Sequence, residues 1–313
     1  MDHEQIVCNI LVSLRGKLSQ AHLSKKLGYK HNQIFKWETN ERRIPWKAFT
    51  DLCHVRKIDL AKIIWTNFRF SGDVSDASKL LSYIIGNSEA KVISKTLGIS
   101  KYRLSGWLTG KRKPYLDDIL KILDVIEHRM THFIVGILGE KKAEDIGIDL
   151  TSVKFEKFES RNPVFSAFLR IMETKIYSQT KKIEVGFFAK KLGISLEYEK
   201  SLLMEAVELG LLQESHGKYK ANIVHTDLRD SNAVTQQRLY WCKEAIKRLE
   251  SKKITAPESI FGNLIYSATN KEQNLIVERY LGFFNDVRSI INSNDQPEDV
   301  FVLNIQMIPV CRT

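Results

Sequence analysis

Two stretches of the chain carry the same pattern of apolar and polar residues. Residues 24–45 read SKKLGYKHNQIFKWETNERRIP and residues 94–114 read SKTLGISKYRLSGWLTGKRKP, so Leu27, Gly28 and Trp37 recur as Leu97, Gly98 and Trp107. In each stretch the apolar spacing predicts a helix ending at Leu-Gly, a short turn, a second helix, and a basic segment that ends at proline. The repeat therefore predicts two helix-turn-helix units in one chain.

A third helix, Leu-Gly, turn and helix pattern occupies residues 183–222 and ends in two short strand-like runs around His216 and Gly217. This order predicts a winged helix. Its second helix carries four carboxylates, which would repel phosphate, so a structural or dimerisation role is favoured over DNA contact. These carboxylates are Glu197, Glu199, Glu205 and Glu208.

The C-terminal part of the chain combines helical and strand-like patterns. Helices are predicted at about 235–251 and 271–292, and the last segment alternates apolar and other residues as a strand does. One side of this terminal strand carries Phe301, Leu303, Ile305 and Met307. A second chain or the rest of the module must cover that row, so we expect a homodimer through the C-terminal half.

Together these patterns predict a mainly α fold with tandem helix-turn-helix units, a winged-helix-like unit and a small α+β C-terminal module. A linker is expected at residues 67–78, and a charged connection is expected between Gly139 and Pro163. The predicted domains are residues 1–66, 79–138, 163–226 and 227–313.

Positive charge is concentrated in the part of the chain that holds the repeat. Residues 1–130 contain 23 Lys and Arg against 13 Asp and Glu, a net charge of +10, whereas residues 131–313 contain 25 against 24, a net charge of +1. A basic half beside a neutral half is typical of a nucleic-acid-binding unit joined to a part that does not touch phosphate. A basic surface that serves only solubility would give the same count.

Basic residues follow both predicted second helices, and their recurrence favours contacts to backbone phosphates over a solvated loop. In the first copy they are Arg42, Arg43 and Lys47, and in the second they are Lys111, Arg112 and Lys113. Trp37 and Trp107 are different, because each lies three residues after an apolar residue on the inner face of its helix. We expect core packing for both, rather than base stacking.

The two copies resemble the lambda-repressor-like helix-turn-helix family of phage repressors and bacterial regulators, through the shared Leu-Gly and the tryptophan that follows it. Two positions depart from that family. Lys30 stands where the family usually caps the second helix with Ser or Thr, and Gly106 lies inside the second helix, where glycine costs about 1 kcal/mol relative to alanine.

The resemblance implies a set of DNA contacts. It places Gln20 on a backbone phosphate and places the residues at the start of each second helix on base edges. The implied base-reading residues are His31, Asn32, Gln33 and Lys36 in copy one, and Lys101, Tyr102 and Arg103 in copy two. These residue types suit the role, since Asn and Gln bond adenine in a bidentate way and Arg and Lys bond guanine.

The chain as a whole is similar to a larger bacterial family of transcriptional regulators with an uncharacterised C-terminal domain. The similarity is carried by AVELGLLQESHGKYKAN at 206–222, by the helix around 236–249 and by the ending VFVLNIQMIP at 300–309. That ending is similar to the Val-Tyr-Gln-Leu-Asn-Ile-Gln-Leu-Phe-Pro of the family. The resemblance implies a bacterial regulator of transcription.

Other chemistry has little support in the sequence. His128 and His132 are four residues apart without a third metal ligand, so ordinary, partly buried histidines are expected rather than a metal site. No nucleophile or carboxylate cluster indicates an enzyme, and no cofactor is expected. The four cysteines are far apart in the chain, which favours reduced thiols, and no leader or membrane-spanning stretch is recognised, so we expect a cytoplasmic protein without a membrane partner.

The sequence therefore predicts a transcriptional regulator that binds double-stranded DNA through its N-terminal units and uses its C-terminal half to form a homodimer or to sense a signal. A protein-interaction module that acts on another regulator or on the transcription machinery is the alternative. Salt separates the two, because phosphate-driven DNA binding weakens steeply as salt rises.

Overall fold

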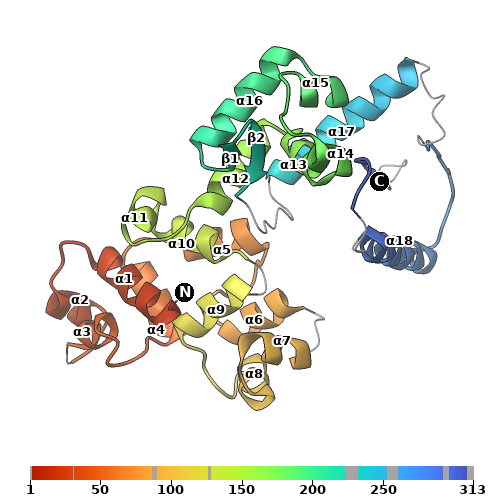
Figure 1. The fold of residues 1–313 in the computed structure, drawn as a ribbon. Coiled ribbons are helices and arrows are strands. Elements are labelled where there is room, and N and C mark those ends of the chain that lie inside the picture. Colours follow the sequence, from red (N-terminus) through yellow and green to blue (C-terminus); the bar gives the residue numbers. More distant parts are fainter. Residues whose placement is uncertain are drawn as a thin grey trace. The chain divides into compact units, whose positions relative to one another are not determined.

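The computed structural model of the chain describes residues 2–30, 32–86, 90–125, 128–222, 232–251, 260–291 and 296–308. These residues form 18 helices and one two-stranded antiparallel sheet, so the fold is mainly helical, as the apolar spacing predicts (Figure 1). Their contacts define two compact units, one built on Met1–Phe158 and the other on Glu159–Glu208, Leu212–Ala221 and Asn232–Thr313. No described helix is long and apolar enough to cross a membrane.

Most of the first unit is a five-helix arrangement that occurs twice. The first occurrence comprises α1 (His3–Arg15), α2 (Gln20–Lys26), α3 (Gln33–Glu38), α4 (Trp46–Val55) and α5 (Leu60–Phe68). The second comprises α6 (Ala77–Ile85), α7 (Ala90–Leu97), α8 (Lys101–Leu108), α9 (Leu116–Val125) and α10 (Met130–Leu138). In four of the five helix pairs the last residues are separated by the same offset as Leu27 and Leu97, so the repeat found in the sequence extends over the whole arrangement.

Equivalent residues end the helices of the two occurrences in the same way. Gly16 and Gly86 both have φ of +57°, a conformation that costs glycine little, and each donates its backbone N–H to the carbonyl four residues earlier. Gly28 and Gly98, the glycines of the two Leu-Gly pairs, also have positive φ. The predicted helix ends at Leu-Gly are therefore confirmed.

The two occurrences share one hydrophobic core instead of forming separate ones. Buried residues from Ile6 to Leu150 belong to a single cluster, and Trp46 of the first occurrence packs against Phe133 of the second with ring centroids 6.2 Å apart. The predicted linker contributes to this packing, because Phe70 is buried and the carbonyl of Val74 accepts a 2.8 Å hydrogen bond from the Trp46 indole. The described residues between 2 and 138 thus form one structural body.

A short backbone bridge joins equivalent positions of the two occurrences. Pro45 and Tyr115, which the offset of the repeat relates, form an antiparallel β-bridge. The N–H of Trp46 donates to the carbonyl of Pro114 at 3.1 Å, and the N–H of Leu116 donates to the carbonyl of Ile44 at 3.0 Å. The bridge fixes the first turn of α4 beside the first turn of α9.

Two helices, α11 (Glu140–Asp145) and α12 (Thr151–Arg161), follow the repeat. The boundary between the two compact units falls inside α12, after Phe158. It lies within the charged stretch between Gly139 and Pro163 where the sequence places the main connection.

The second unit contains α13 (Phe165–Glu173), α14 (Lys175–Gln179), α15 (Phe187–Leu192), α16 (Leu196–Glu208), β1 (Leu212–Ser215) and β2 (Lys218–Ala221). The strands pair in the register Leu212↔Ala221 to Ser215↔Lys218. His216 and Gly217 form the turn with φ of +52° and +72°, the left-handed conformation that tight two-residue hairpin turns require. The predicted strand-like runs around these two residues are confirmed as a hairpin.

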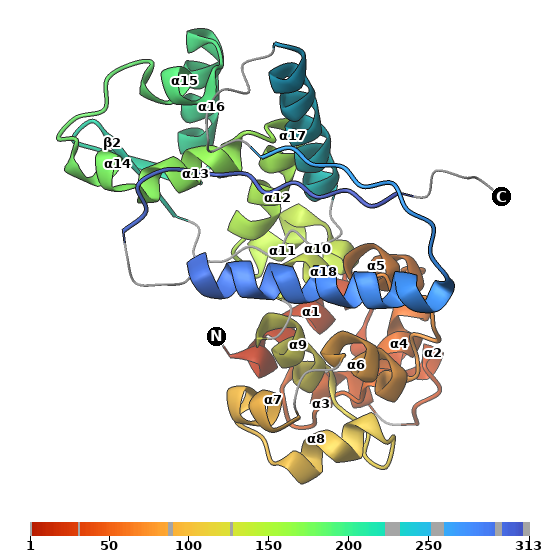
Figure 2. The ribbon, with the colours of Figure 1, turned by 90° about the vertical axis from the view of Figure 1, so that its right-hand side faces the viewer.

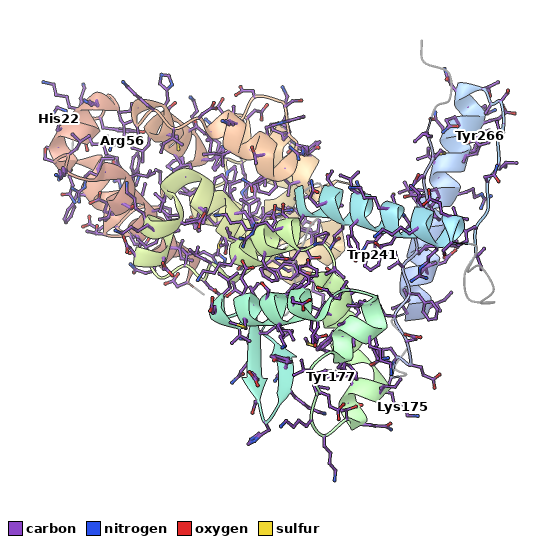
Figure 3. The ribbon with its side chains drawn as sticks, turned by 90° about the horizontal axis from the view of Figure 1, so that it is seen from above. His22, Arg56, Lys175, Tyr177, Trp241 and Tyr266 are labelled. Atoms are coloured by element: carbon purple, nitrogen blue, oxygen red, sulfur yellow. The ribbon has the colours of Figure 1, made fainter. Side chains whose placement is uncertain are left out.

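Aromatic side chains pack the helices of this unit against one another and join them to the hairpin. Phe168 and Phe188 stack with ring centroids 4.6 Å apart. Tyr177 of α14 is labelled in Figure 3. Its hydroxyl accepts from the N–H of Tyr219 and donates to the carbonyl of Tyr219, both at 2.8 Å. This single hydroxyl therefore anchors β2 to α14.

One of the four glutamates expected to repel phosphate has an internal role. Glu199 is buried, and its carboxylate accepts hydrogen bonds from the backbone N–H groups of Gly186 and Ala189 at 3.0 and 2.5 Å. These N–H groups lie at the start of α15, where a carboxylate satisfies unpaired donors and is favoured by the helix dipole. Glu199 is therefore a helix cap within the unit.

A second buried carboxyl group joins three helices of this unit. Glu159 in α12 is fully buried, and its Oε1 accepts from the N–H of Ser166 at 3.1 Å and from the side-chain amide of Gln237. Its Oε2 has no hydrogen-bond partner among the described residues. Burial raises the pKa of Glu159 from 4.5 to about 7, against the lowering effect of these hydrogen bonds.

The last helices are α17 (Asn232–Glu250) and α18 (Asn270–Ile291), which match the two predicted near the C-terminus (Figure 2). The predicted terminal strand is wrong for residues 301–308, which form no sheet in the structure. Their apolar side chains are exposed, from 40% for Ile305 to 75% for Ile308. Alternation makes a segment suitable for a strand, but a strand also needs a neighbour to bond its backbone, and none of the described residues provides one.

Candidate nucleic-acid interface

The helix pairs α2–α3 and α7–α8 place equivalent residues in equivalent surroundings. Trp37 and Trp107 are both only 3% exposed, which confirms that they pack in the core. The N–H of Arg42 donates to the carbonyl of Lys36 at 3.0 Å, and the N–H of Arg112 donates to the carbonyl of Gly106 at 2.8 Å. The basic segment after each second helix therefore begins in the same backbone conformation.

The start of each second helix is capped by a serine, but by a different one. In α8 the Ser100 hydroxyl accepts from the N–H of Arg103 at 3.2 Å, as an N-cap does. In α3 the N-cap residue Asn32 makes no such bond, and the buried Ser24 hydroxyl of α2 accepts from the N–H of Ile34 at 3.2 Å. A cap from the preceding helix thus replaces the one that Lys30 does not supply.

The predicted base-reading residues of α3 occupy one outward side. Asn32 is exposed, Gln33 and Lys36 are half-buried, and His31 lies outside the described residues. Phe35, which the sequence does not single out, adds an apolar ring that is 40% exposed. The outward face of α3 is thus polar with one aromatic side chain.

The outward face of α8 is dominated by one aromatic residue. Lys101 is exposed and Tyr102 is 86% exposed, the highest value for any aromatic residue among those described. The Arg103 side chain does not extend outward as those of Lys101 and Tyr102 do. Its guanidinium lies over the Trp107 ring, 5.1 Å from the centroid.

Gln20 also has an internal partner. Its side-chain amide donates to Glu38 at 2.6 Å, and Arg15 donates to the other oxygen of the same carboxylate at 2.6 Å. The Glu38 side chain is only 4% exposed, so this carboxylate ties α1 and α2 to the end of α3. A phosphate contact by Gln20 would have to use the second N–H of its amide.

Most of the predicted phosphate contacts are accessible. Lys47 is exposed and pairs with the equally exposed Asp51 at 2.6 Å, an ion pair that is worth little in water. The side chain of Arg112 lies over Gly106, where an added Cβ would approach its Cδ to 2.9 Å. The glycine that weakens α8 therefore makes room for the stem of Arg112. The exposed members of the set are Arg42, Lys47, Lys111, Arg112 and Lys113.

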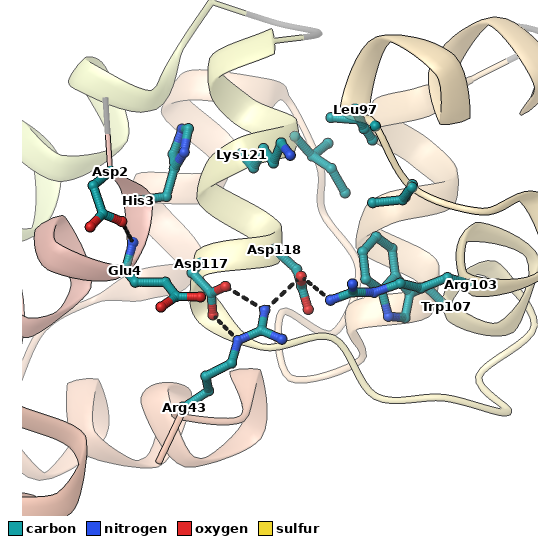
Figure 4. Close-up of a pocket in the computed structure, with 13 residues that line it drawn as sticks. Asp2, His3, Glu4, Arg43, Leu97, Arg103, Trp107, Asp117, Asp118 and Lys121 are labelled. Atoms are coloured by element: carbon teal, nitrogen blue, oxygen red, sulfur yellow. Dashed lines mark hydrogen bonds and ion pairs between the residues drawn. The ribbon is translucent and has the colours of Figure 1, made fainter. Parts of the chain in front are cut away.

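Arg43 and Arg103, from different occurrences of the repeat, meet at two aspartates that begin α9 (Figure 4). Arg43 donates to both oxygens of Asp117, with Nε to Oδ1 at 3.0 Å, and to Asp118 Oδ1 at 2.7 Å. Arg103 donates to the same Oδ1 at 2.7 Å. Asp118 Oδ2 accepts the N–H of Tyr115 at 3.0 Å, so this carboxylate is fully engaged. We call these four side chains the Arg–Asp cluster.

The two aspartates of the cluster are largely shielded from water, whereas the arginines are partly exposed. The Asp117 and Asp118 side chains are 11% and 8% exposed. Burial by itself would lower the pKa of Arg43, but the hydrogen bonds that Arg43 donates to both aspartates outweigh this effect and the pKa is raised. The Arg43 guanidinium also lies over the Tyr115 ring, 4.3 Å from its centroid. Arg43 is therefore held as a cation on three sides.

Magnitudes indicate that Arg43 stays in place when an anion approaches. Removing one partner of a buried ion pair costs about 3 to 5 kcal/mol, because it leaves a desolvated charge. An exposed ion pair returns about 1 kcal/mol or less. Arg43 serves both shielded aspartates, so it would gain less from a phosphate than it loses by leaving them.

Two clefts adjoin the cluster and share some of its residues. One, of about 340 Å³, includes Asp2, Glu4 and Lys121 and is mixed in charge. The other, of about 560 Å³, is mainly basic. It is lined by Arg43, Arg103, Trp107, Arg112, Lys113, Tyr115 and Asp118.

The aspartates have no counterparts in the first occurrence of the repeat. The positions there that are equivalent to Asp117 and Asp118 hold Lys47 and Ala48. The cluster thus breaks the symmetry of the two occurrences. Sequence reasoning missed it, because acidic residues in the first turn of a helix are common for the sake of the helix dipole alone.

His132 pairs with a carboxylate, and Cys53 is buried. His132 Nε2 lies 2.8 Å from the Glu156 carboxylate, which also pairs with Arg129 at 3.2 Å. Within the described ranges, no three metal-ligating side chains come together. Burial raises the pKa of the Cys53 thiol to about 12, which makes it a poor nucleophile at neutral pH.

No protein-family model, curated protein or solved structure matches this chain.

Proposed function

We propose that this protein is a sequence-specific DNA-binding regulator of transcription. The observation that carries the proposal is the repeated helix pair, in which α2–α3 and α7–α8 share a buried tryptophan and the same bonding of the following basic segment. We interpret each pair as a helix-turn-helix unit whose second helix presents its outward face to a major groove.

Charge supports the same proposal. The net charge of +10 within residues 1–130 attracts a polyanion, and exposed cations follow both second helices. In this proposal Lys47, Lys111 and Lys113 bond backbone phosphates, which sets the register of the protein on DNA without reading sequence.

Base reading is assigned to the outward faces of α3 and α8. Asn32, Gln33 and Lys36 suit adenine and guanine edges in the first site, and Lys101 and Tyr102 face outward at the second. Because the two sets differ in residue type, we propose that the two half-sites on DNA differ in sequence.

We propose that the C-terminal half forms a homodimer. Residues 301–308 expose apolar side chains, and α18 exposes more, with Leu281 at 56% and Ile291 at 71%. A monomer rarely leaves so much apolar surface in contact with water. A twofold dimer would bring four helix-turn-helix units to DNA and raise affinity through effective concentration.

The winged-helix-like part of the second unit is assigned a supporting role in this proposal. Its hairpin and its α16 fit the winged-helix layout, and the exposed glutamates of α16 would repel phosphate. We therefore place DNA contact in the first unit and oligomerisation or signal sensing in the second.

Selection of bound duplexes from a random pool with the full-length protein tests the proposal. Enrichment of one sequence motif, with binding that weakens by orders of magnitude between about 50 and 200 mM salt, is the expected result. A pool that stays unenriched after repeated rounds, at low salt, would contradict it.

One observation favours a second candidate, a protein-interaction module. The 86% exposure of Tyr102 places an aromatic ring on the outward face of α8, in its first turn, and tyrosine is enriched where proteins bind proteins. Binding of a partner protein that depends on Tyr102 and changes little with salt would support this candidate over DNA binding.

A further inference from the structure

The basic cleft beside the Arg–Asp cluster combines residues of both occurrences of the repeat. Arg43 comes from the segment after α3, and Arg103 and Lys113 come from α8 and the segment after it. Asp118 Oδ1 accepts from both guanidinium groups at 2.7 Å, so one carboxylate oxygen sets the separation of the two arginines.

Counted over the residues that the structure describes, both arginines keep unused donors while they hold Asp118. A guanidinium has five N–H groups. Arg43 makes three hydrogen bonds in the cluster, which leaves two N–H groups, and Arg103 makes one, which leaves four. The cluster therefore presents oriented donors to an anion without any rearrangement of the arginines.

Other contacts of the cluster fix the orientation of these donors. Asp118 is itself bonded to the N–H of Tyr115, a residue of the backbone bridge between the occurrences. The Tyr115 and Trp107 rings lie against the two guanidinium groups. Fixed donors lose little conformational entropy when they bind a ligand.

We infer that this basic cleft is a preformed site for one phosphate of the DNA backbone, bonded by Arg43 and Arg103 together, and that Asp118 is the residue that positions them. The inference rests on the proposed function. It assigns Arg103 to the backbone instead of to a guanine edge, and it makes the two helix-turn-helix units one binding surface with a shared central phosphate.

The direction in which Asp118→Asn changes the affinity for DNA distinguishes a positioning role of Asp118 from a purely electrostatic one. Asp118→Asn removes a negative charge beside DNA, so electrostatics alone would raise the affinity. If Asp118 positions the arginines, the same change lowers affinity, because the neutral amide holds two guanidinium groups less firmly. Glu41→Gln is the matched control, since it removes a charge from the exposed loop after α3 without touching the cluster.

A second substitution keeps the charge and changes only the geometry. Arg103→Lys retains one positive charge but loses the planar set of donors that serves Asp118 and a phosphate at once. We expect about tenfold weaker binding of the selected duplex, the loss that one charge-assisted hydrogen bond implies. Arg56→Lys, at a half-buried arginine outside the cleft, is the control and is expected to bind as the wild type does.

The decisive experiment combines these variants with duplexes in which one phosphate at a time is replaced by an uncharged methylphosphonate. We expect one central phosphate whose replacement weakens wild-type binding about tenfold and adds little further loss in Arg103→Lys or Asp118→Asn. Thermal unfolding of each variant checks that it is folded, and Arg103→Lys alone suffices if Asp118→Asn does not fold.

The outcomes separate the two proposals. Failure of the wild type to bind any selected duplex overturns the proposed function itself. Specific binding in which every phosphate replacement adds its full loss to Arg103→Lys, or in which Asp118→Asn binds more tightly than the wild type, leaves the proposed function standing and overturns the phosphate site.

Discussion

Replacing Glu159 by glutamine should remove the pH dependence that this buried carboxyl group gives to the stability of the second unit. The pKa of this buried carboxyl is raised from 4.5 to about 7, so its ionised form is disfavoured in the folded protein. Each unit of difference between folded and unfolded pKa corresponds to about 1.4 kcal/mol, which puts the full effect at about 3 kcal/mol. The sign follows from the raised pKa. The contribution of Glu159 to the free energy of unfolding is fully present below about pH 4.5 and is lost as the pH rises toward 7. Above pH 7 it no longer changes with pH.

Glutamine has the shape of the protonated carboxyl but does not titrate. It keeps the oxygen that accepts from Ser166 and Gln237, and it places an amide N–H₂ where Oε2 has no partner among the described residues. The unpaired amide costs about 1 kcal/mol. The variant should therefore be less stable than the wild type by about 1 kcal/mol at pH 4, nearly as stable at pH 5, and more stable by about 2 kcal/mol at pH 8.

Hydrogen exchange of the α12, α13 and α17 amides, followed by mass spectrometry on the full-length protein, measures this directly. Comparing wild type and variant at the same pH cancels the intrinsic exchange rate. Glu197→Gln, at an exposed position of α16, is the control and should leave the pH dependence unchanged. Stability profiles of wild type and Glu159→Gln that run parallel from pH 5 to pH 8 would refute the reasoning.

Three further predictions follow from the division of the chain. A fragment of residues 1–158 should shift the selected duplex in a gel. A fragment that ends at residue 66 lacks half of the shared core, so it should show no cooperative transition in thermal unfolding. Gln33→Ala should relax the sequence preference at one base position and cost about 1 to 3 kcal/mol of binding free energy. Lys113→Ala should weaken binding to all duplexes alike and lower the slope of affinity against salt by about one unit. Binding titrations against a panel of sites and salt concentrations measure both effects. Equal losses on all sites for both variants would leave base reading unsupported. Deleting residues 260–313 should convert a dimer into a monomer by light scattering, and a full-length monomer at tens of micromolar protein would contradict the proposed dimer.

Local pattern was sufficient for the elements that depend on neighbouring residues. The helix ends at Gly28 and Gly98, the burial of Trp37 and Trp107, and the hairpin turn at His216 and Gly217 were all predictable. Each depends on φ preference or on helical periodicity over a few residues. The constant offset between the two occurrences could likewise be read from the repeated residues.

Tertiary structure decided every feature that joins distant parts of the chain. Arg43 bonds a carboxylate 74 residues away, and Asp118 holds one arginine from each occurrence of the repeat. Two further features are of the same kind. They are the shared core of the two occurrences and the lack, among the described residues, of a strand partner for residues 301–308. Helices and turns are set by interactions within a few residues, so sequence determines them. Ion pairs, shared cores and strand partners depend on which surfaces meet, and only the folded chain brings those surfaces together.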